Sequence, residues 1–249
     1  MIDTSGTAYK VAYDLKDLDS EVKALDLRGK QFNSFPSEIL QHTQLQILIL
    51  TGEESKQNNF ESFPAEISEL NQLISLYLEY CGIESLPEQI QALKNLRDLS
   101  LKGNRLKELP ASFMEFRALK TLDLSENQLT EISEKIGNLK ELRKLGLAQN
   151  QLKALPGSFW ELTKLTELSL LDNQLTGISE EIGNLSDLKT LVISQNRLQA
   201  LPLSLWKLSG LTELSVRSKQ LAEIPEEIGN LNNLQLLGLA QNQLKALPQ

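Results

Sequence analysis

Few side chains in this sequence are of the types that carry out catalysis or bind metals. The chain has one histidine, His42, and one cysteine, Cys81. A Ser–His–acid or Cys–His centre would have to use His42, which lies in a Gln-His-Thr segment without a supporting signature. One histidine and one cysteine do not make a credible zinc site, and no phosphate-loop or dinucleotide-binding glycine motif occurs. The sequence therefore predicts no catalytic residue, no metal and no cofactor, and a protein that is not an enzyme.

Carboxylate pairs recur, but at positions that have a structural explanation. Glu226 and Glu227, for example, follow Pro225 at the start of an expected helical segment. Negative charge is favourable there because the first turn of a helix exposes unpaired N–H groups. We therefore interpret these pairs as supporting the fold and not as acid–base catalysts.

The net charge of the chain is −8, and its isoelectric point is about 4.9. An acidic chain is poorly suited to nucleic acid or to an anionic lipid surface, since both require positive charge. No apolar stretch approaches the roughly 18 residues of a membrane span, and residues 1–10 contain no signal-peptide core. A cytoplasmic location is the default expectation, and secretion or display on a cell surface stays open if a signal peptide has been removed.

The dominant feature of the sequence is a repeat of 23 residues. Leu96, Leu99, Leu101, Asn104 and Leu106 return at the same spacing in one copy after another. The first position of the ten copies is occupied by Val22, Leu45, Leu73, Leu96, Leu119, Leu142, Leu165, Leu188, Leu211 and Leu234. The copy that begins at Leu45 is longer by five residues, within the segment 51–59. Such a period is the signature of a solenoid in which neighbouring copies bury a shared core.

The prolines support the same register independently. All eight occupy one position of the repeat: Pro36, Pro64, Pro87, Pro110, Pro156, Pro202, Pro225 and Pro248. The two copies without proline have Ser133 and Ser179 there. Proline suits the first position of a helix and serine suits its N-cap. Since Leu99 and Leu101 are two residues apart and share one face of a strand, each copy is predicted to be a strand, a tight turn and a short helical segment.

The pattern LxxLxLxxNxLxxLPxxIGxL resembles the leucine-rich repeat family, in the 23-residue bacterial form found among spirochaetes. The resemblance covers residues 22–249. It implies an α/β fold: a right-handed horseshoe-shaped solenoid with a concave parallel β-sheet and short helical or 3-10 turns on the convex side. It also implies a role in protein–protein interaction, in recognition or as a scaffold.

One column of the repeat is mostly asparagine. It contains Asn104, Asn127, Asn150, Asn173, Asn196 and Asn242. Because the chain turns inward there, stacked amides can satisfy backbone groups that would otherwise be buried without partners. Cys81 occupies the same column, where we interpret it as a buried structural thiol. Lys30 and Lys219 also fall in this column, and we expect them to reach solvent and to weaken the ladder locally.

The ends differ from the middle. Residues 1–21 precede the repeats, and we interpret them as a capping segment with a short helix over residues 8–19, on the near-helical spacing of Val11, Leu15 and Leu18. The repeat domain occupies residues 22–249, and its tenth copy is incomplete. That incomplete copy suggests a piece of a longer protein.

Function is expected on the outward positions of the strands, which vary at fixed geometry. Copies one to five present large or charged side chains there, whereas later copies present mostly small ones. Tyrosine and arginine are enriched at interface hot spots, so the predicted partner-binding residues are Arg28, Ile47, Ile49, Tyr77, Glu79, Tyr80, Asp98, Lys102 and Asp123. The alternative is that these are ordinary solvated strand residues.

Three further features remain open. Leu171, Val192 and Leu236 form a second, smaller apolar group. The insertion at 51–59 is either an adjustable flap near the first group or a loop of no consequence. Trp160 and Trp206, which recur with a period of 46, either pack on the convex wall over neighbouring glycines or form an exposed ridge for a second partner.

The sequence thus predicts a non-catalytic module that binds a protein through the concave sheet face. The alternative is the regulatory or recognition part of a larger signalling or effector enzyme. A monomer is expected, with self-association through uncapped ends or the tryptophan ridge as a further possibility.

Overall fold

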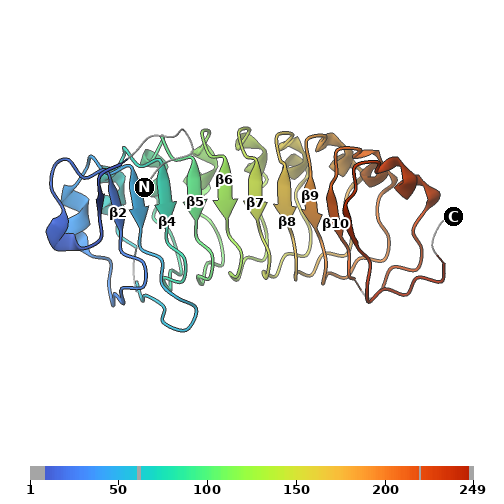
Figure 1. Cartoon of the computed structure of the whole chain (residues 1–249), viewed down its shortest axis with the longest axis horizontal. Helices are drawn as coiled ribbons and strands as arrows, with labels where there is room; N and C mark the ends of the chain where they lie inside the picture. Colours follow the sequence, from blue (N-terminus) through green and yellow to red (C-terminus); the bar gives the residue numbers. More distant parts are fainter. Residues whose placement is uncertain (1–8, 61–62, 219, 247–249) are drawn as a thin grey trace. The chain divides into compact units, whose positions relative to one another are not determined.

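The computed structural model describes residues 9–60, 63–218 and 220–246, and the chain divides into two compact units, Met1–Asp123 and Leu124–Gln249. In each unit the strands are parallel and follow one another in chain order (Figure 1). The first unit contains β1 (Val11–Ala12), β2 (Ala24–Asp26), β3 (Ile47–Ile49), β4 (Ser75–Tyr77), β5 (Asp98–Ser100) and β6 (Thr121–Asp123). The second contains β7 (Lys144–Gly146), β8 (Glu167–Ser169), β9 (Thr190–Val192), β10 (Glu213–Ser215) and β11 (Leu236–Gly238).

Short 3-10 helices, labelled η, connect the strands. Those of the first unit are η1 (Leu15–Asp17), η2 (Ser37–Gln41), η3 (Ala65–Glu69), η4 (Glu88–Ala92) and η5 (Ala111–Glu115). Those of the second are η6 (Ile136–Asn138), η7 (Gly157–Glu161), η8 (Glu180–Asn184), η9 (Leu203–Lys207) and η10 (Glu226–Asn230). The expected repeat of one strand and one short helical turn is therefore confirmed in both units, and β2 to β11 are the ten repeat strands.

The register of the sheet stacks equivalent leucines of successive repeats. Leu76 of β4 pairs with Leu99 of β5, which pairs with Leu122 of β6. All three are at most 1% exposed. A single repeat cannot bury these side chains, so the core exists only between neighbouring repeats.

The prolines lie one residue before the helices and not at their first position. Pro87, for example, is the N-cap of η4, and Pro248 lies outside the described residues. Ser179 is the N-cap of η8 and accepts a hydrogen bond from the backbone N–H of Glu181, as predicted. Ser133 is different, because η6 begins only at Ile136 and its N-cap is Lys135.

The asparagine column satisfies buried backbone groups as predicted. The Asn150 Nδ2 donates to the carbonyls of Leu124 and Leu147 at 3.0 and 3.2 Å, and its Oδ1 accepts from the N–H of Leu129 at 3.0 Å. Asn58 occupies this position in the longer repeat: it is 1% exposed, donates to the carbonyl of Leu50 and accepts from the N–H of Phe32. The five-residue insertion hid Asn58 from the sequence pattern.

Three other residues replace asparagine in the column, and the structure describes two of them. Cys81 is fully buried, its thiol donates to the carbonyl of Leu50, and burial raises its pKa to about 12. This confirms a structural thiol. Lys30 is only partly exposed and forms an ion pair with Asp14 at 2.6 Å, so its stem leaves the column as predicted. Lys219 lies outside the described residues.

The predicted helix over residues 8–19 is wrong for the part that the structure describes. Val11 and Ala12 form β1, which pairs in parallel with Ala24 and Leu25 of β2. A single 3-10 turn, η1, follows, with the Asp14 side chain accepting from the N–H of Lys16. The segment adds a strand beside β2, and this arrangement satisfies backbone groups that a helix would leave unpaired at a sheet edge.

The exposed tryptophan ridge is also contradicted. Trp160 and Trp206 are 3% and 0% exposed, so both pack inside the second unit. The glycine one repeat before Trp160 is Gly137, and it lies close to a serine: a Cβ on Gly137 would be 2.7 Å from the carbonyl oxygen of Ser158. The serine explains the 46-residue period as well, because the hydroxyls of Ser112, Ser158 and Ser204 donate to the carbonyls of Glu88, Glu134 and Glu180 one repeat earlier.

Candidate functional site

We call the side of the sheet that carries the first and third residues of each strand the open face. The middle residue of each strand from β2 to β10 is a buried leucine, whereas Leu237 of β11 is 41% exposed, so along β2 to β10 the open face is the side of the strands that points away from the leucine core. In the first unit, Ile49, Tyr77, Ser100 and Asp123 are aligned as a row by the strand register. All nine predicted contact residues lie in this unit, in β2 to β6 or just after these strands.

The two isoleucines of the predicted set form the base of a small apolar cluster. Ile47 and Ile49 are 4% and 7% exposed and pack with Ala24, although strand alternation places them on the open face. Tyr9, Val11 and Tyr77 pack against them. The sheet is thus covered by its own side chains here, and Tyr77 presents its ring above the isoleucines.

Tyr77 packs against this cluster, and its hydroxyl lies within the field of the Asp98 carboxylate on the next strand. Burial raises the pKa of its hydroxyl, and the negative charge of Asp98 raises it further. Asp98 accepts a hydrogen bond from the Ser75 hydroxyl at 3.1 Å. Tyr77 is therefore neutral at physiological pH, with an ordered carboxylate beside it. The Ser100 hydroxyl of the same row is buried, and no hydrogen-bond partner is found for it among the described residues.

Tyr80 lies at the turn that follows β4, in the left-handed region with a φ of 52°. Other repeats have glycine or a polar residue at this turn, for example Gly103, Glu126 and Gln149. The Lys102 ammonium lies 5.9 Å from the centre of the Tyr80 ring. A Cβ on Gly103 would come within 2.3 Å of that ring, so the absent side chain of Gly103 is what makes room for it. Tyr80 is partly exposed, and its ring fills the space beside Gly103.

Arg28 and Asp26 form a fork at the N-terminal end of the face. Arg28 donates from Nε to Oδ1 of Asp26 at 2.9 Å and from Nη2 to Oδ2 at 2.6 Å. Burial opposes ionisation of Asp26, but hydrogen bonds from the Arg28 side chain and backbone outweigh it, and the pKa of Asp26 is lowered. Arg28 is one of the predicted contact residues, and the sequence pattern did not show that its charge is paired to the buried Asp26.

The insertion at 51–59 is fastened to the candidate site at both ends. The backbone N–H of Gly52 donates to the carbonyl of Glu79 at 2.8 Å, and the backbone N–H of Asn58 donates to the carbonyl of Tyr80 at 2.9 Å. Between them Glu53 and Lys56 form an isolated antiparallel bridge. The base of the insertion therefore supports the turn that carries Tyr80, while its tip is exposed.

The second apolar group is only partly assembled. Leu171 and Val192 line a hollow of about 390 Å³ on the open face of the second unit, together with Ser194, Gln195, Ser215, Arg217 and Gln241. Leu236 is not among these lining residues and is 51% exposed on β11. Arg217, which sequence analysis did not select, gives this hollow a positive charge. Arg217 could have been found from the sequence, because it is a large cation among outward residues that are mostly small.

No group of three or more His, Cys, Asp or Glu side chains in the described residues is arranged to hold a metal ion. Within the same part of the chain, none of the helices combines the length and apolarity needed to cross a membrane.

Comparison with known proteins identifies the class. A family model described as leucine rich repeat matches residues 71–129, 94–152, 117–175 and 163–221, which together make up more than half of the sequence. The chain belongs to the leucine-rich repeat family, whose members generally mediate protein–protein interaction. A comparison with proteins of curated function finds no match.

Solved structures show the same fold. A leucine-rich repeat protein of Leptospira interrogans is 36% identical with a TM-score of 0.86, covering 92% of this chain and 57% of that one. The functional domain of InlJ from Listeria monocytogenes is 24% identical with a TM-score of 0.78, covering 91% and 46%. The ectodomain of the Arabidopsis receptor kinase HAESA, in complex with a peptide hormone, is 28% identical with a TM-score of 0.74, covering 88% and 38%. The chain spans less than two thirds of each.

Proposed function

We propose that this chain is a non-catalytic module that binds a protein partner through the open face of β2 to β6. The observation that carries the proposal is the pair Tyr77 and Tyr80, two partly exposed aromatic side chains, of which the first packs on the apolar cluster and the second lies near the Lys102 ammonium. A fixed aromatic ring binds with little loss of conformational entropy. The HAESA ectodomain, which has the same fold, is in complex with a peptide hormone, and this supports recognition of a polypeptide.

The contributions of the nine predicted residues differ in this proposal. Tyr77, Glu79, Tyr80, Asp98, Lys102 and Asp123 supply the contact surface. Arg28 extends it with a side chain that is 64% exposed and a guanidinium that is paired with Asp26. Ile47 and Ile49 act from beneath, because they are buried and position Tyr77.

The test removes the Tyr80 ring and keeps the turn. We expect Tyr80→Asn to fold normally, because asparagine tolerates the left-handed conformation better than most residues. The wild-type chain is used as bait in a cell extract, and recovered proteins are quantified by mass spectrometry. A genuine partner should be recovered with the wild type and with Gln91→Ala, an exposed control next to Ile90 on η4. Its recovery should fall roughly tenfold or more with Tyr80→Asn, as for a hot-spot residue.

Equal recovery of every captured protein by Tyr80→Asn and Gln91→Ala would contradict the assignment of this surface. Circular dichroism and thermal melting of both variants establish that the fold is retained. If the Tyr80→Asn variant melts much earlier, partner recovery is measured instead with Lys102→Glu, which reverses the charge beside the Tyr80 ring and keeps the ring. Recovery equal to that of Gln91→Ala would then contradict the assignment.

We infer as a second candidate that the chain is the regulatory or recognition part of a larger signalling or effector enzyme. The supporting observation is that the HAESA ectodomain, which has the same fold, is part of a receptor kinase. Sequencing the gene beyond the codon for Gln249 tests this. A reading frame that continues into a catalytic domain supports it, and a stop codon there rejects it.

A further inference from the structure

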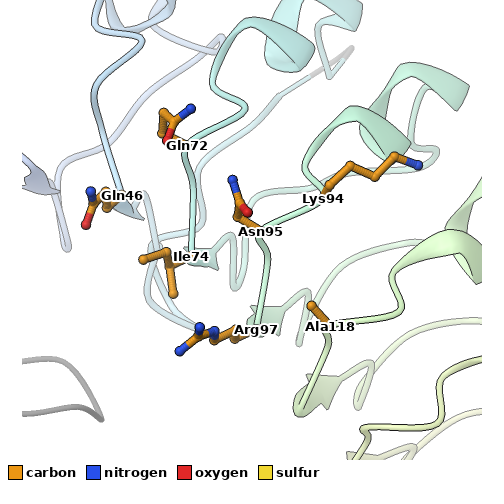
Figure 2. Close-up of a pocket in the computed structure, with 7 residues that line it drawn as sticks. All are labelled: Gln46, Gln72, Ile74, Lys94, Asn95, Arg97 and Ala118. Carbon is orange, nitrogen blue, oxygen red and sulfur yellow. The ribbon is translucent and has the colours of Figure 1, made fainter.

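A second polar hollow lies away from the open face, where the chain enters the strands of the first unit. It has a volume of about 300 Å³ and is lined by Gln46, Gln72, Ile74, Lys94, Asn95, Arg97 and Ala118 (Figure 2). Gln46, Ile74 and Arg97 immediately precede β3, β4 and β5. Gln72 and Asn95 stand two residues earlier in their repeats, so the hollow lies between two rows of equivalent positions.

The charge of this hollow is opposite to that of the chain. Arg97 and Lys94 are exposed cations, and none of the seven described lining residues is acidic, although the chain as a whole carries −8. No ion pair is found for either cation within residues 9–60, 63–218 and 220–246. Figure 2 shows the Lys94 side chain extending away from Arg97, so Arg97 is the principal charge in the hollow.

The backbone at this edge is already used. Ile74 donates from its N–H to the carbonyl of Gln46 at 2.8 Å, Arg97 donates to Ile74 at 2.8 Å, and Lys120 donates to Arg97 at 2.7 Å. The amide nitrogen of Asn95 donates to the carbonyl of Asn71 at 3.1 Å. An added strand would find these backbone groups occupied, so a ligand here is recognised by side chains.

The hollow also has an apolar part, which includes a residue at a repeat position that is otherwise polar. The residue before the strand is polar in every other repeat: Lys23, Gln46, Arg97, Lys120, Arg143, Thr166, Lys189, Thr212 and Gln235. Ile74 is the exception, and it lies between Gln46 and Arg97 with Ala118 in the same lining. The combination suits a ligand that has both an anionic group and a short aliphatic portion.

We propose that this hollow binds an acidic peptide segment, with a side-chain carboxylate paired to Arg97 and aliphatic groups over Ile74 and Ala118. A planar guanidinium can donate two parallel hydrogen bonds to one carboxylate. A polyanion such as nucleic acid is less suitable, because the net charge of −8 repels it. The site lies outside the open face, and it rests on the proposed function only in that the segment belongs to a protein.

The test uses a fluorescein-labelled octapeptide of alternating glutamate and alanine, and a matched peptide of alternating glutamine and alanine. Fluorescence anisotropy with the full chain at low salt should show binding of the glutamate peptide and at least about tenfold weaker binding of the glutamine peptide. Arg97→Gln should weaken binding of the glutamate peptide about tenfold, the effect of losing one charge-assisted hydrogen-bonded pair.

The control is Arg105→Gln. It removes the same charge from the same repeat, but after the strand, where Arg105 pairs loosely with Glu84 at 3.8 Å. Its affinity for the glutamate peptide should equal that of the wild type. Equal weakening by Arg97→Gln and Arg105→Gln would overturn the proposal in favour of net charge alone, and so would equal binding of the two peptides or no binding of the glutamate peptide. Tyr80→Asn should leave peptide affinity unchanged, so this result is independent of the test of the open face.

Discussion

At the scale of single residues, the asparagine column explains how a chain that turns inward every 23 residues avoids unpaired backbone groups. Each buried asparagine serves two repeats: Asn173 donates to the carbonyls of Leu147 and Leu170 and accepts from the N–H of Leu152. An asparagine can do this because its amide has both donors and an acceptor. The same geometry accounts for Cys81, whose thiol can donate but offers only a weak acceptor.

Replacing one member of the column should therefore destabilise the fold. Asn150→Ala leaves the buried N–H of Leu129 without an acceptor. It also removes one of the two amide donors on each of the carbonyls of Leu124 and Leu147, which keep those of Asn127 and Asn173. We expect the free energy of unfolding to fall by about 2–3 kcal/mol. Urea denaturation followed by circular dichroism measures this. Asn232→Ala, at an exposed position of the second unit, should change it by less than about 0.5 kcal/mol, and equal effects of the two substitutions would refute the role of the column.

The sequence predicted most of this column but missed Asn58. The pattern depends on fixed spacing, and the insertion at 51–59 shifts Asn58 by five positions. The candidate site shows a different limit. Alternation along a strand places Ile47 and Ile49 outward, but their burial depends on Tyr9 and Tyr77 from other parts of the chain. Contacts between distant segments are not encoded in local spacing.

At the scale of elements, each repeat is a three-residue strand connected to a 3-10 helix of three to five residues. Such short helices are not stable alone, so they depend on contacts with the next repeat. Glu180 illustrates this, because its carboxylate accepts hydrogen bonds from the N–H groups of Leu203 and Ser204 at 3.0 and 2.9 Å. These hydrogen bonds, led by the one from the Ser204 N–H, lower the pKa of Glu180.

Close packing between neighbouring helices predicts that alanine substitution at two glycines will change the stability by different amounts. Gly137→Ala would place a methyl group 2.7 Å from the carbonyl oxygen of Ser158, whereas a Cβ on Gly157 meets nothing within 4 Å. We expect Gly137→Ala to lower the free energy of unfolding by about 1–3 kcal/mol through overpacking, and Gly157→Ala to change it by about 0.5 kcal/mol or less. Thermal and urea unfolding of both variants decide this. Matching stabilities would show that neighbouring helices are not packed as closely as described.

The sequence predicted the strands and helices of the repeats because leucine and proline spacing is local information. It did not predict β1. Val11 and Ala12 form a strand only because the edge of β2 offers backbone partners, and that edge is a property of the folded sheet. The serine contacts that explain the 46-residue period were hidden for the same reason, since each joins residues 24 positions apart.

At the scale of the whole molecule, the repeats create two kinds of surface in the first unit. The open face carries aromatic and charged side chains, and the edge where the chain enters the strands carries a cationic hollow around Arg97. Neither surface forms part of the leucine core. Recognition can therefore vary from one leucine-rich repeat protein to another while the buried leucines and asparagines stay in place.

The central claim, that a protein partner docks on the open face, is tested most directly by site-specific photo-crosslinking. The photoreactive amino acid benzoylphenylalanine replaces Tyr77 in one protein and Gln91, on the helix side of the same unit, in another. Both are irradiated in the presence of the captured partner. We predict a covalent adduct from position 77 and none from position 91, with the crosslink at position 77 abolished by Tyr80→Asn. An adduct from position 91 alone would contradict the claim.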